Sequence, residues 1–225
     1  MDKPKGRHEL KHYISYGDML QLRARLSFVA KPDKNSADGK GYRVRSLYFD
    51  NYNDKVLKEK INGVNDREKF RLRFYNNDIS FIRLEKKSKK NGICFKENAT
   101  VTYEQCRRLI HGDITALKEN GCPLCLELYS KMQYQQLRAR KIVDYRREAY
   151  VYLPGNVRVT LDYDIRTTHT ADSFLRSESV NIPIPEVYIL EVKFDSFLPE
   201  IIRGIVSLPS RSSAAFSKYA ATRII

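Results

Sequence analysis

The sequence predicts an α+β protein whose main element is a sheet of about eight antiparallel strands. In four segments, apolar side chains alternate with charged or hydroxyl-bearing ones. Because strand side chains point to opposite faces in turn, each segment has one apolar and one polar face. Turn residues at 76–77 and 91–92 separate successive strand patterns, which favours an antiparallel meander. The polar rows are Lys69, Arg71, Arg73; Arg83, Glu85, Lys87; Arg158, Thr160, Asp162; and Glu191, Lys193, Asp195.

The first third of the chain contains two strand patterns and two helix patterns. The spacing of Met19, Leu22 and Leu26 indicates an amphipathic helix, and Gly63 stops a second, shorter one. A polar stretch that contains Pro32 is typical of a loop. The expected elements are a strand at residues 7–14, a helix at 16–28, a loop at 31–41, a strand at 42–49 and a helix at 53–62.

The remaining elements follow the same signals. Thr102 and Gln105 form a capping box, which predicts a helix that ends near residue 111. A segment rich in Ser, Thr and Pro, residues 168–185, is expected to be a long irregular connection. The expected strands lie at 69–75, 80–88, 93–101, 141–153, 157–167 and 188–194, with a turn at 154–156 and helices at 126–137, 199–206 and 217–221.

The composition indicates one domain that binds an anionic partner. With 225 residues, of which 42% are hydrophobic, the chain can bury a substantial core, so a single domain over residues 1–225 is expected. Lys and Arg outnumber Asp and Glu by 41 to 27, a net charge of +14, which suits nucleic acid, anionic lipid or a small polyanion. No apolar run is long enough for a signal peptide or a membrane segment, so a cytoplasmic location is expected.

Four cysteines are too few for a disulfide scaffold of this size and fit free thiols in a reducing compartment. Cys122 and Cys125 have the spacing of a zinc knuckle or a redox pair. No second pair and no His cluster completes such a site. Two partly buried thiols near the start of a helix are therefore expected.

The charged strand faces allow two kinds of packing. They can be solvated around an apolar sandwich core, as most charged strand faces are. Alternatively, the sheet can close and turn them inward, since a barrel of about eight strands can hold one slender ligand. Inward cations with a carboxylate among them would suit a phosphate chain held together with a divalent metal.

Five strings, in order along the chain, carry a family resemblance. They are EKFRLRFY, IRLEKKSKKNGICFK, YRREAYVYLPGNVRVTLD, YILEVKFD and FSKY. Together they resemble the catalytic domain of the vacuolar transporter chaperone (VTC) complex, a polyphosphate polymerase in the triphosphate tunnel metalloenzyme (CYTH-like) superfamily. The resemblance runs from about Arg7 to Tyr219. It implies a closed antiparallel eight-stranded β-tunnel with helices packed outside and at the ends.

The resemblance also implies roles for individual residues. It implies that Glu191 binds a divalent metal, Mn²⁺ or Mg²⁺. Catalytic roles fall on Lys11, Arg71, Arg73, Lys87 and Lys218, and further phosphate binding falls on Lys96, Arg147, Arg158 and Ser217.

The implied activity is transfer of the γ-phosphate of ATP onto a growing inorganic polyphosphate chain, with release of ADP, by a phosphotransferase. Hydrolases and cyclases of the superfamily typically open with Glu-x-Glu-x-Lys, whereas here Arg7 precedes Glu9 and Lys11. The missing first acid favours the polymerase. The alternatives are a tripolyphosphatase or nucleoside triphosphatase of the same superfamily, and a non-catalytic module that binds polyphosphate or nucleic acid. The fifteen tyrosines form no nucleic-acid-binding motif, so no nucleic-acid partner is expected and most are expected to pack on the barrel exterior.

Overall fold

A computed structural model of the chain describes residues 6–36, 41–168, 170–176, 182–208 and 217–223. Its centre is one antiparallel sheet in which eight strands follow one another as hydrogen-bonded neighbours. Two strands of two residues each, β2 (Lys31–Pro32) and β9 (Ile182–Pro183), pair with β7 and β8. In spatial order the eight are β1 (His8–Ile14), β10 (Tyr188–Phe194), β8 (Val157–Thr168), β7 (Arg138–Tyr152), β3 (Tyr42–Asp50), β4 (Arg67–Tyr75), β5 (Ile82–Lys90) and β6 (Ile93–Val101).

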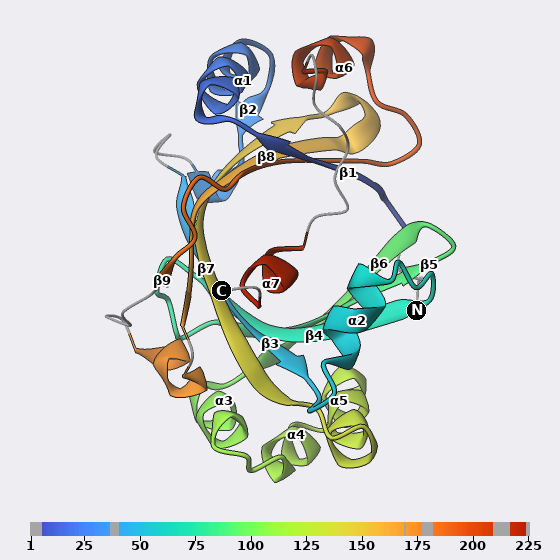
Figure 1. Cartoon of the computed structure of the whole chain (residues 1–225), viewed down its shortest axis with the longest axis vertical. Coiled ribbons are helices and arrows are strands. Elements are labelled where there is room, and N and C mark those ends of the chain that lie inside the picture. Colours follow the sequence, from blue (N-terminus) through green and yellow to red (C-terminus); the bar gives the residue numbers. More distant parts are fainter. Residues whose placement is uncertain (1–5, 37–40, 169, 177–181, 209–216, 224–225) are drawn as a thin grey trace.

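The sheet curls until its two edge strands meet, as Figure 1 shows. The meeting is one isolated bridge, in which Arg7 N donates to Cys94 O at 3.4 Å. The antiparallel order of eight strands is confirmed, but the expected full closure is wrong for the described residues. Since the pairing is antiparallel, the residue after Arg7 would pair with Ile93, the first residue of β6. The residues after that would face the turn at 91–92, so the ladder cannot continue along β1.

Helices cover the outside of this curled sheet and also enter it. In Figure 1, α1 (Tyr16–Val29) and α6 (Glu200–Val206) lie over β8 and β1. The opposite outer side carries α3 (Tyr103–Ile110), α4 (Thr115–Asn120) and α5 (Pro123–Tyr134). Two helices differ in position: α2 (Lys55–Ile61) packs on β4, and α7 (Lys218–Ala221) projects within the ring of strands. The prediction that helices lie outside is confirmed for α1 and for α3 to α6, while α2 and α7 pack against the inner face of the sheet.

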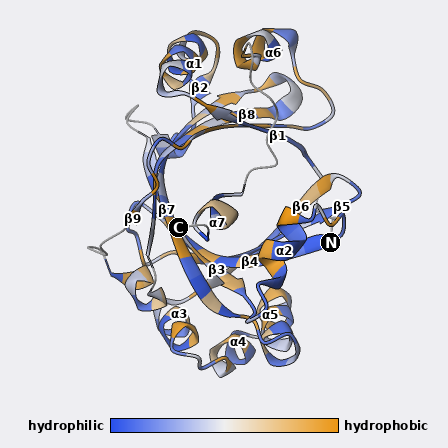
Figure 2. Cartoon of the chain, viewed as in Figure 1, coloured by the Kyte–Doolittle hydropathy of each residue, from blue (hydrophilic) through white to orange (hydrophobic). Residues whose placement is uncertain are grey.

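Alternating side chains divide the core between the two faces of the sheet. One outer cluster joins strands β3 to β5 to α3, α4 and α5, and another joins β7, β8 and β10 to α1 and α6. A third, smaller cluster joins the inner face to α2 and α7 through Val56 and Tyr219. The alternation of hydrophilic and hydrophobic residues along the strands is visible in Figure 2. Most of the apolar core therefore lies between the outer face of the sheet and the helices, and the inner face carries the smaller cluster together with the polar rows.

Several local expectations are confirmed and others are wrong. Thr102 caps α3 as predicted, with its side chain accepting from Gln105 N. Cys122 caps α5 through Sγ, which accepts from Cys125 N, and Cys125 is fully buried, so the two are free thiols at a helix start. This helix begins and ends three residues earlier than expected. The helix α4 and the two-residue strands were not predicted, because such short segments show no periodicity.

The connection expected at residues 168–185 is partly ordered where it is described. It contains the last residue of β8, the 3₁₀ helix Ala171–Leu175 and β9; residues 169 and 177–181 lie outside the described residues. Two further 3₁₀ helices are Lys34–Ser36 and Pro154–Asn156. Within the described ranges, the structure has no helix that is both long and apolar enough to cross a membrane.

Candidate functional site

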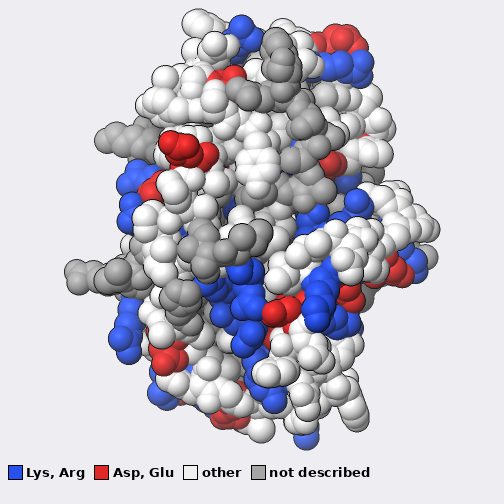
Figure 3. All heavy atoms as spheres, in the orientation of Figure 1, with Lys and Arg blue, Asp and Glu red and all other residues white. Residues whose placement is uncertain are grey.

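The inner face of the sheet lines a cavity of about 510 Å³. Lys and Arg side chains gather near the middle of the face seen in Figure 3, with Asp and Glu between them. Among the described residues that line the cavity, eleven are Lys or Arg and three are Glu. All ten predicted site residues are among them: Lys11, Arg71, Arg73, Lys87, Lys96, Arg147, Arg158, Glu191, Ser217 and Lys218.

Strand alternation explains why these side chains point inward. In β4, Phe70, Leu72 and Phe74 are buried in the outer core, so the residues between them face the cavity. Antiparallel pairing extends each row across the sheet, because directly opposite residues share a face. Two residues at the ends of the predicted rows do not line the cavity. Arg83 lies over the Phe81 ring, with Cζ 4.7 Å from the ring centre, and Asp195 follows the end of β10.

Glu85 holds three of the predicted phosphate-binding cations. Its Oε2 lies 2.7 Å from Arg71 Nη2 and 3.6 Å from Arg73 Nη1, and its Oε1 lies 2.5 Å from Lys96 Nζ. Burial alone would raise the pKa of Glu85, but the three cations outweigh it and hold that pKa well below its usual range. Arg71 also donates to Tyr48 Oη at 2.9 Å, and Arg73 donates to Ser46 Oγ at 2.9 Å. Glu85 therefore fixes the direction of both guanidinium forks.

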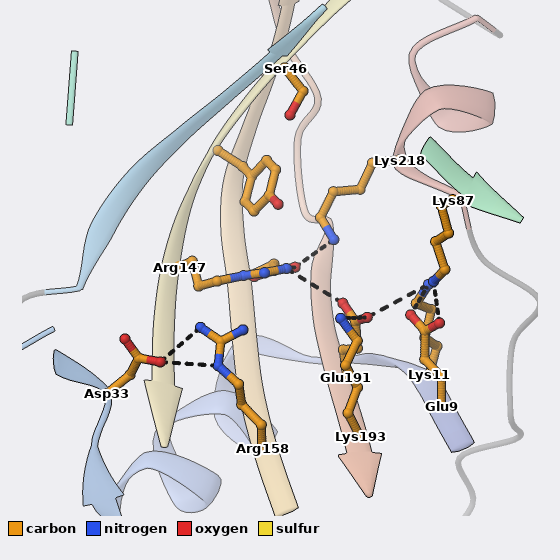
Figure 4. A network of polar contacts seen from close by, with 12 residues as sticks. Glu9, Lys11, Asp33, Ser46, Lys87, Arg147, Arg158, Glu191, Lys193 and Lys218 are labelled. Atoms are coloured by element: carbon orange, nitrogen blue, oxygen red, sulfur yellow. Dashed lines mark hydrogen bonds and ion pairs between the residues drawn. The ribbon is translucent and has the colours of Figure 1, made fainter. Parts of the chain in front are cut away.

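A second cluster is centred on the buried carboxylate of Asp162. Arg147 binds it with two hydrogen bonds, of 2.6 and 2.7 Å, and Lys218 Nζ lies 2.5 Å from Oδ2. Burial would raise the pKa of Asp162, but these two cations lower it. Figure 4 shows Arg147 and Lys218 converging near Glu191, whose Oε2 is 3.4 Å from Arg147 Nη2. Ser217 caps α7, with Oγ accepting from Ala220 N at 3.4 Å.

Arg158 lies on one side of this cluster. Its guanidinium is 3.1 Å from Asp33 and donates to Tyr42 Oη at 2.8 Å. Figure 4 places it beside Arg147 on the neighbouring strand. Arg158 is therefore oriented by a third carboxylate, Asp33, and not by Asp162.

Two carboxylates, Glu9 and Glu191, lie on adjacent strands and share Lys11 as a neighbour. Lys11 Nζ lies 2.7 Å from Glu9 and 3.9 Å from Glu191, and Lys193 lies 3.0 Å from Glu191. Lys87 also contacts Glu9. Burial opposes ionisation of Glu191, but the surrounding cations hold its pKa well below the usual range. Both carboxylates are thus available as anionic oxygen donors at neutral pH.

These donors fit a hard divalent cation such as Mg²⁺ or Mn²⁺, which prefers carboxylate and phosphate oxygens. The described part of the chain has no cluster of three or more His, Cys, Asp or Glu that could hold a metal. Glu191 and Glu9 would therefore hold the ion together with oxygens of a bound phosphate chain. This dependence on substrate oxygens is common for Mg²⁺ sites.

The predicted set omitted several residues that line the cavity or orient its cations. Lys69, Glu85, Asp162 and Lys193 stand in the alternating rows themselves, so the pattern already contained the signal. Four of the fifteen tyrosines also line the cavity. These are Tyr42, Tyr48, Tyr75 and Tyr145, of which Tyr145 lies 4.8 Å from Lys218 Nζ and 5.3 Å from Arg147 Cζ, measured to its ring centre.

Arg7, which stands in place of the first acid of the Glu-x-Glu-x-Lys motif, lies at the edge of the cavity. Its Nε is 2.9 Å from Asp195, and its Nη2 donates to the Asn156 carbonyl oxygen. Arg7 is thus ion-paired with Asp195 and supplies no third carboxylate to Glu9 and Glu191.

Comparisons with known proteins agree with this geometry. The VTC domain matches residues 6–224. No curated protein matches the sequence. A candidate adenylate cyclase from Bacillus halodurans superposes with a TM-score of 0.53 at 14% identity, covering 92% of this chain and 94% of that one. The protein PH1819 from Pyrococcus horikoshii OT3 superposes with a TM-score of 0.50 at 12% identity, covering 97% and 98%.

Identities this low show a shared fold and nothing about activity. The family match, by contrast, spans nearly the whole chain and confirms the resemblance drawn from the five strings. The chain belongs to the VTC domain family.

Proposed function

We propose that the protein is a metal-dependent polyphosphate polymerase, which transfers the γ-phosphate of ATP onto an inorganic polyphosphate chain and releases ADP. One observation carries the proposal: eleven cations and three carboxylates line one cavity inside the sheet. A slender, highly charged polyanion matches this excess of positive charge. A nucleic-acid duplex is too wide to reach these side chains, because they point into the ring of strands.

The arrangement supports phosphoryl transfer by positioning and charge neutralisation. Arg71 and Arg73 present adjacent forks that can hold oxygens of the donor triphosphate in register. Lys11 and Lys87, beside the carboxylate pair, and Lys218, on α7, supply further positive charge. A metal ion held by Glu191 and phosphate oxygens would offset charge on the leaving diphosphate. A terminal phosphate oxygen of the chain attacks the γ-phosphorus while the bond to the β–γ bridging oxygen breaks, so no protein nucleophile is needed.

Synthesis is favoured over hydrolysis by the residue that stands two positions before Glu9. A hydrolase must position and activate a water molecule, for which a further carboxylate is suited. Here Arg7 takes that place, and an additional cation favours an anionic acceptor instead.

The test is incubation of the protein with ATP and Mn²⁺, followed by a gel for long polyphosphate and an assay for free phosphate. We expect ADP and acid-precipitable polyphosphate in nearly matching phosphate amounts, with little free phosphate. The double variant Arg71→Ala, Arg73→Ala should abolish both products, because the donor loses charged hydrogen bonds worth about 1.5–3 kcal/mol each. Stoichiometric free phosphate without polymer would reject synthesis and identify a triphosphatase.

A further inference from the structure

Ten of the eleven cations that line the cavity lie within 4.0 Å of a carboxylate. The exception is Lys69, for which no ion pair with any described carboxylate is found. Its Nζ instead lies 5.3 Å from the ring centre of Tyr48. We propose that Lys69 binds a phosphate group of the substrate and takes up a proton as it does so. This inference rests on the proposed function, because it needs a polyanion in the cavity.

Lys69 lies where the main cavity meets a second one. The second cavity, of about 360 Å³, is lined mainly by residues of β1, α2, β4 and β5. Lys69 lines both spaces, together with Glu9, Lys11, Lys87, Cys94 and Ser217. A phosphate chain that extends from one cavity into the other would therefore pass among these six residues, of which Lys69 is one.

The charges around Lys69 disfavour its protonated form when no anion is bound. Burial has the largest effect, and the cations Arg71, Lys87 and Lys11 add to it, while Tyr48 opposes them. Together they lower the pKa of Lys69 to about 7. The other titratable groups that line the second cavity are Glu9 from β1, Lys60 from α2, Arg67 and Glu68 from β4, Lys89 from β5, Cys94 and, from α7, Tyr219.

Tyr48 and Lys69 influence each other's pKa. Burial would raise the pKa of its phenol, but Arg71, Lys69 and Arg73 lower that pKa to about 7. Both Tyr48 and Lys69 therefore titrate near neutral pH. An arriving phosphate adds negative charge beside Lys69 and so favours its charged form.

Binding and protonation are then linked. If the pKa of Lys69 is about 7 in the free protein and well above 8 in the complex, about 0.9 proton is taken up at pH 8 and about 0.5 at pH 7. An arginine at this position is charged in both states and takes up none. The comparison of Lys with Arg therefore isolates this one proton from those that triphosphate itself exchanges.

The experiment is titration calorimetry of inorganic triphosphate at pH 8, in two buffers that differ in ionisation enthalpy. The proteins are the wild type, Lys69→Arg, Lys69→Met and, as a control on an exposed helix position, Lys118→Met. We expect the wild type to take up about 0.5–0.9 proton more than Lys69→Arg. Lys69→Met should weaken binding about 10- to 100-fold, as expected for loss of one charged hydrogen bond, while Lys118→Met should bind as the wild type does.

The outcomes separate this inference from the proposed function. If the wild type does not bind triphosphate, the proposed function fails and this inference fails with it. If the wild type binds and Lys69→Met binds equally well, Lys69 is no phosphate ligand and only this inference is overturned. Tyr48→Phe is the second variant. If Lys69→Arg takes up as many protons as the wild type and Tyr48→Phe takes up fewer, the proton goes to Tyr48, and the inference is equally overturned.

Discussion

Replacing Glu85 with Gln keeps the shape of the side chain and removes the charge on which three cations depend. Arg71, Arg73 and Lys96 lie 2.5–3.6 Å from its oxygens, and Glu85 is 1% exposed. Removing one partner of a buried ionic group typically costs about 3–5 kcal/mol, because the remaining charges stay buried without compensation. For a chain of this length, that loss lowers the melting temperature by about 10 °C.

The effect of triphosphate on the stability of the Glu85→Gln variant makes this prediction specific. In the wild type, a bound triphosphate competes with Glu85 for the two guanidinium forks. In Glu85→Gln it meets unpaired cations, so the variant should gain more stability from triphosphate than the wild type. The assay is thermal or urea unfolding with and without millimolar triphosphate. The control is Glu97→Gln, whose carboxylate is 46% exposed and 3.5 Å from Lys86, where a loss below about 1 kcal/mol is expected.

Two results would refute this reasoning. The variant could be as stable as the wild type without ligand, which would mean that the cations do not need Glu85. Alternatively, the deficit could be the same with and without triphosphate, which would mean that the ligand does not bind at these forks.

Three further predictions follow from buried contacts. Glu191→Gln should lower metal-dependent turnover by at least about 100-fold while triphosphate still binds, and unchanged turnover would make Glu191 only an ion-pair partner. Tyr219→Phe removes a hydroxyl that donates to buried Asp50 at 2.8 Å, so unfolding should cost about 1–3 kcal/mol less, and triphosphate affinity should fall because α7 carries Lys218. The pKa values of Asp162 and Glu191 are lowered by folding, so both stabilise the fold above their ordinary pKa values near 4 and lose this effect as the pH falls. The free energy of unfolding, measured by urea titration, should therefore decrease between about pH 5 and pH 3, and a constant value over that range would contradict the ion pairs.

Much of the sheet and the candidate site could be predicted from local pattern. Strand patterns and turn residues predicted all eight long strands, and period-two alternation separated the row that contains Arg71 and Arg73 from the apolar face of β4. Alternation carries this information because it depends only on the backbone of a single strand. Two-residue strands and the short helix α4 have no such period, so they were not visible in the sequence.

The sequence by itself determined which side chains share a face, the excess of positive charge and the family to which the chain belongs. It left open whether the charged faces point to solvent or inward, because alternation is the same in both cases. The tertiary structure decided this through the curl of the sheet, which gathers residues as far apart as Glu9, Glu85 and Glu191 around one cavity. It also placed α7 inside the ring, where Lys218 meets Asp162. These contacts depend on how strands distant in sequence pair and bend, and local periodicity contains no record of that.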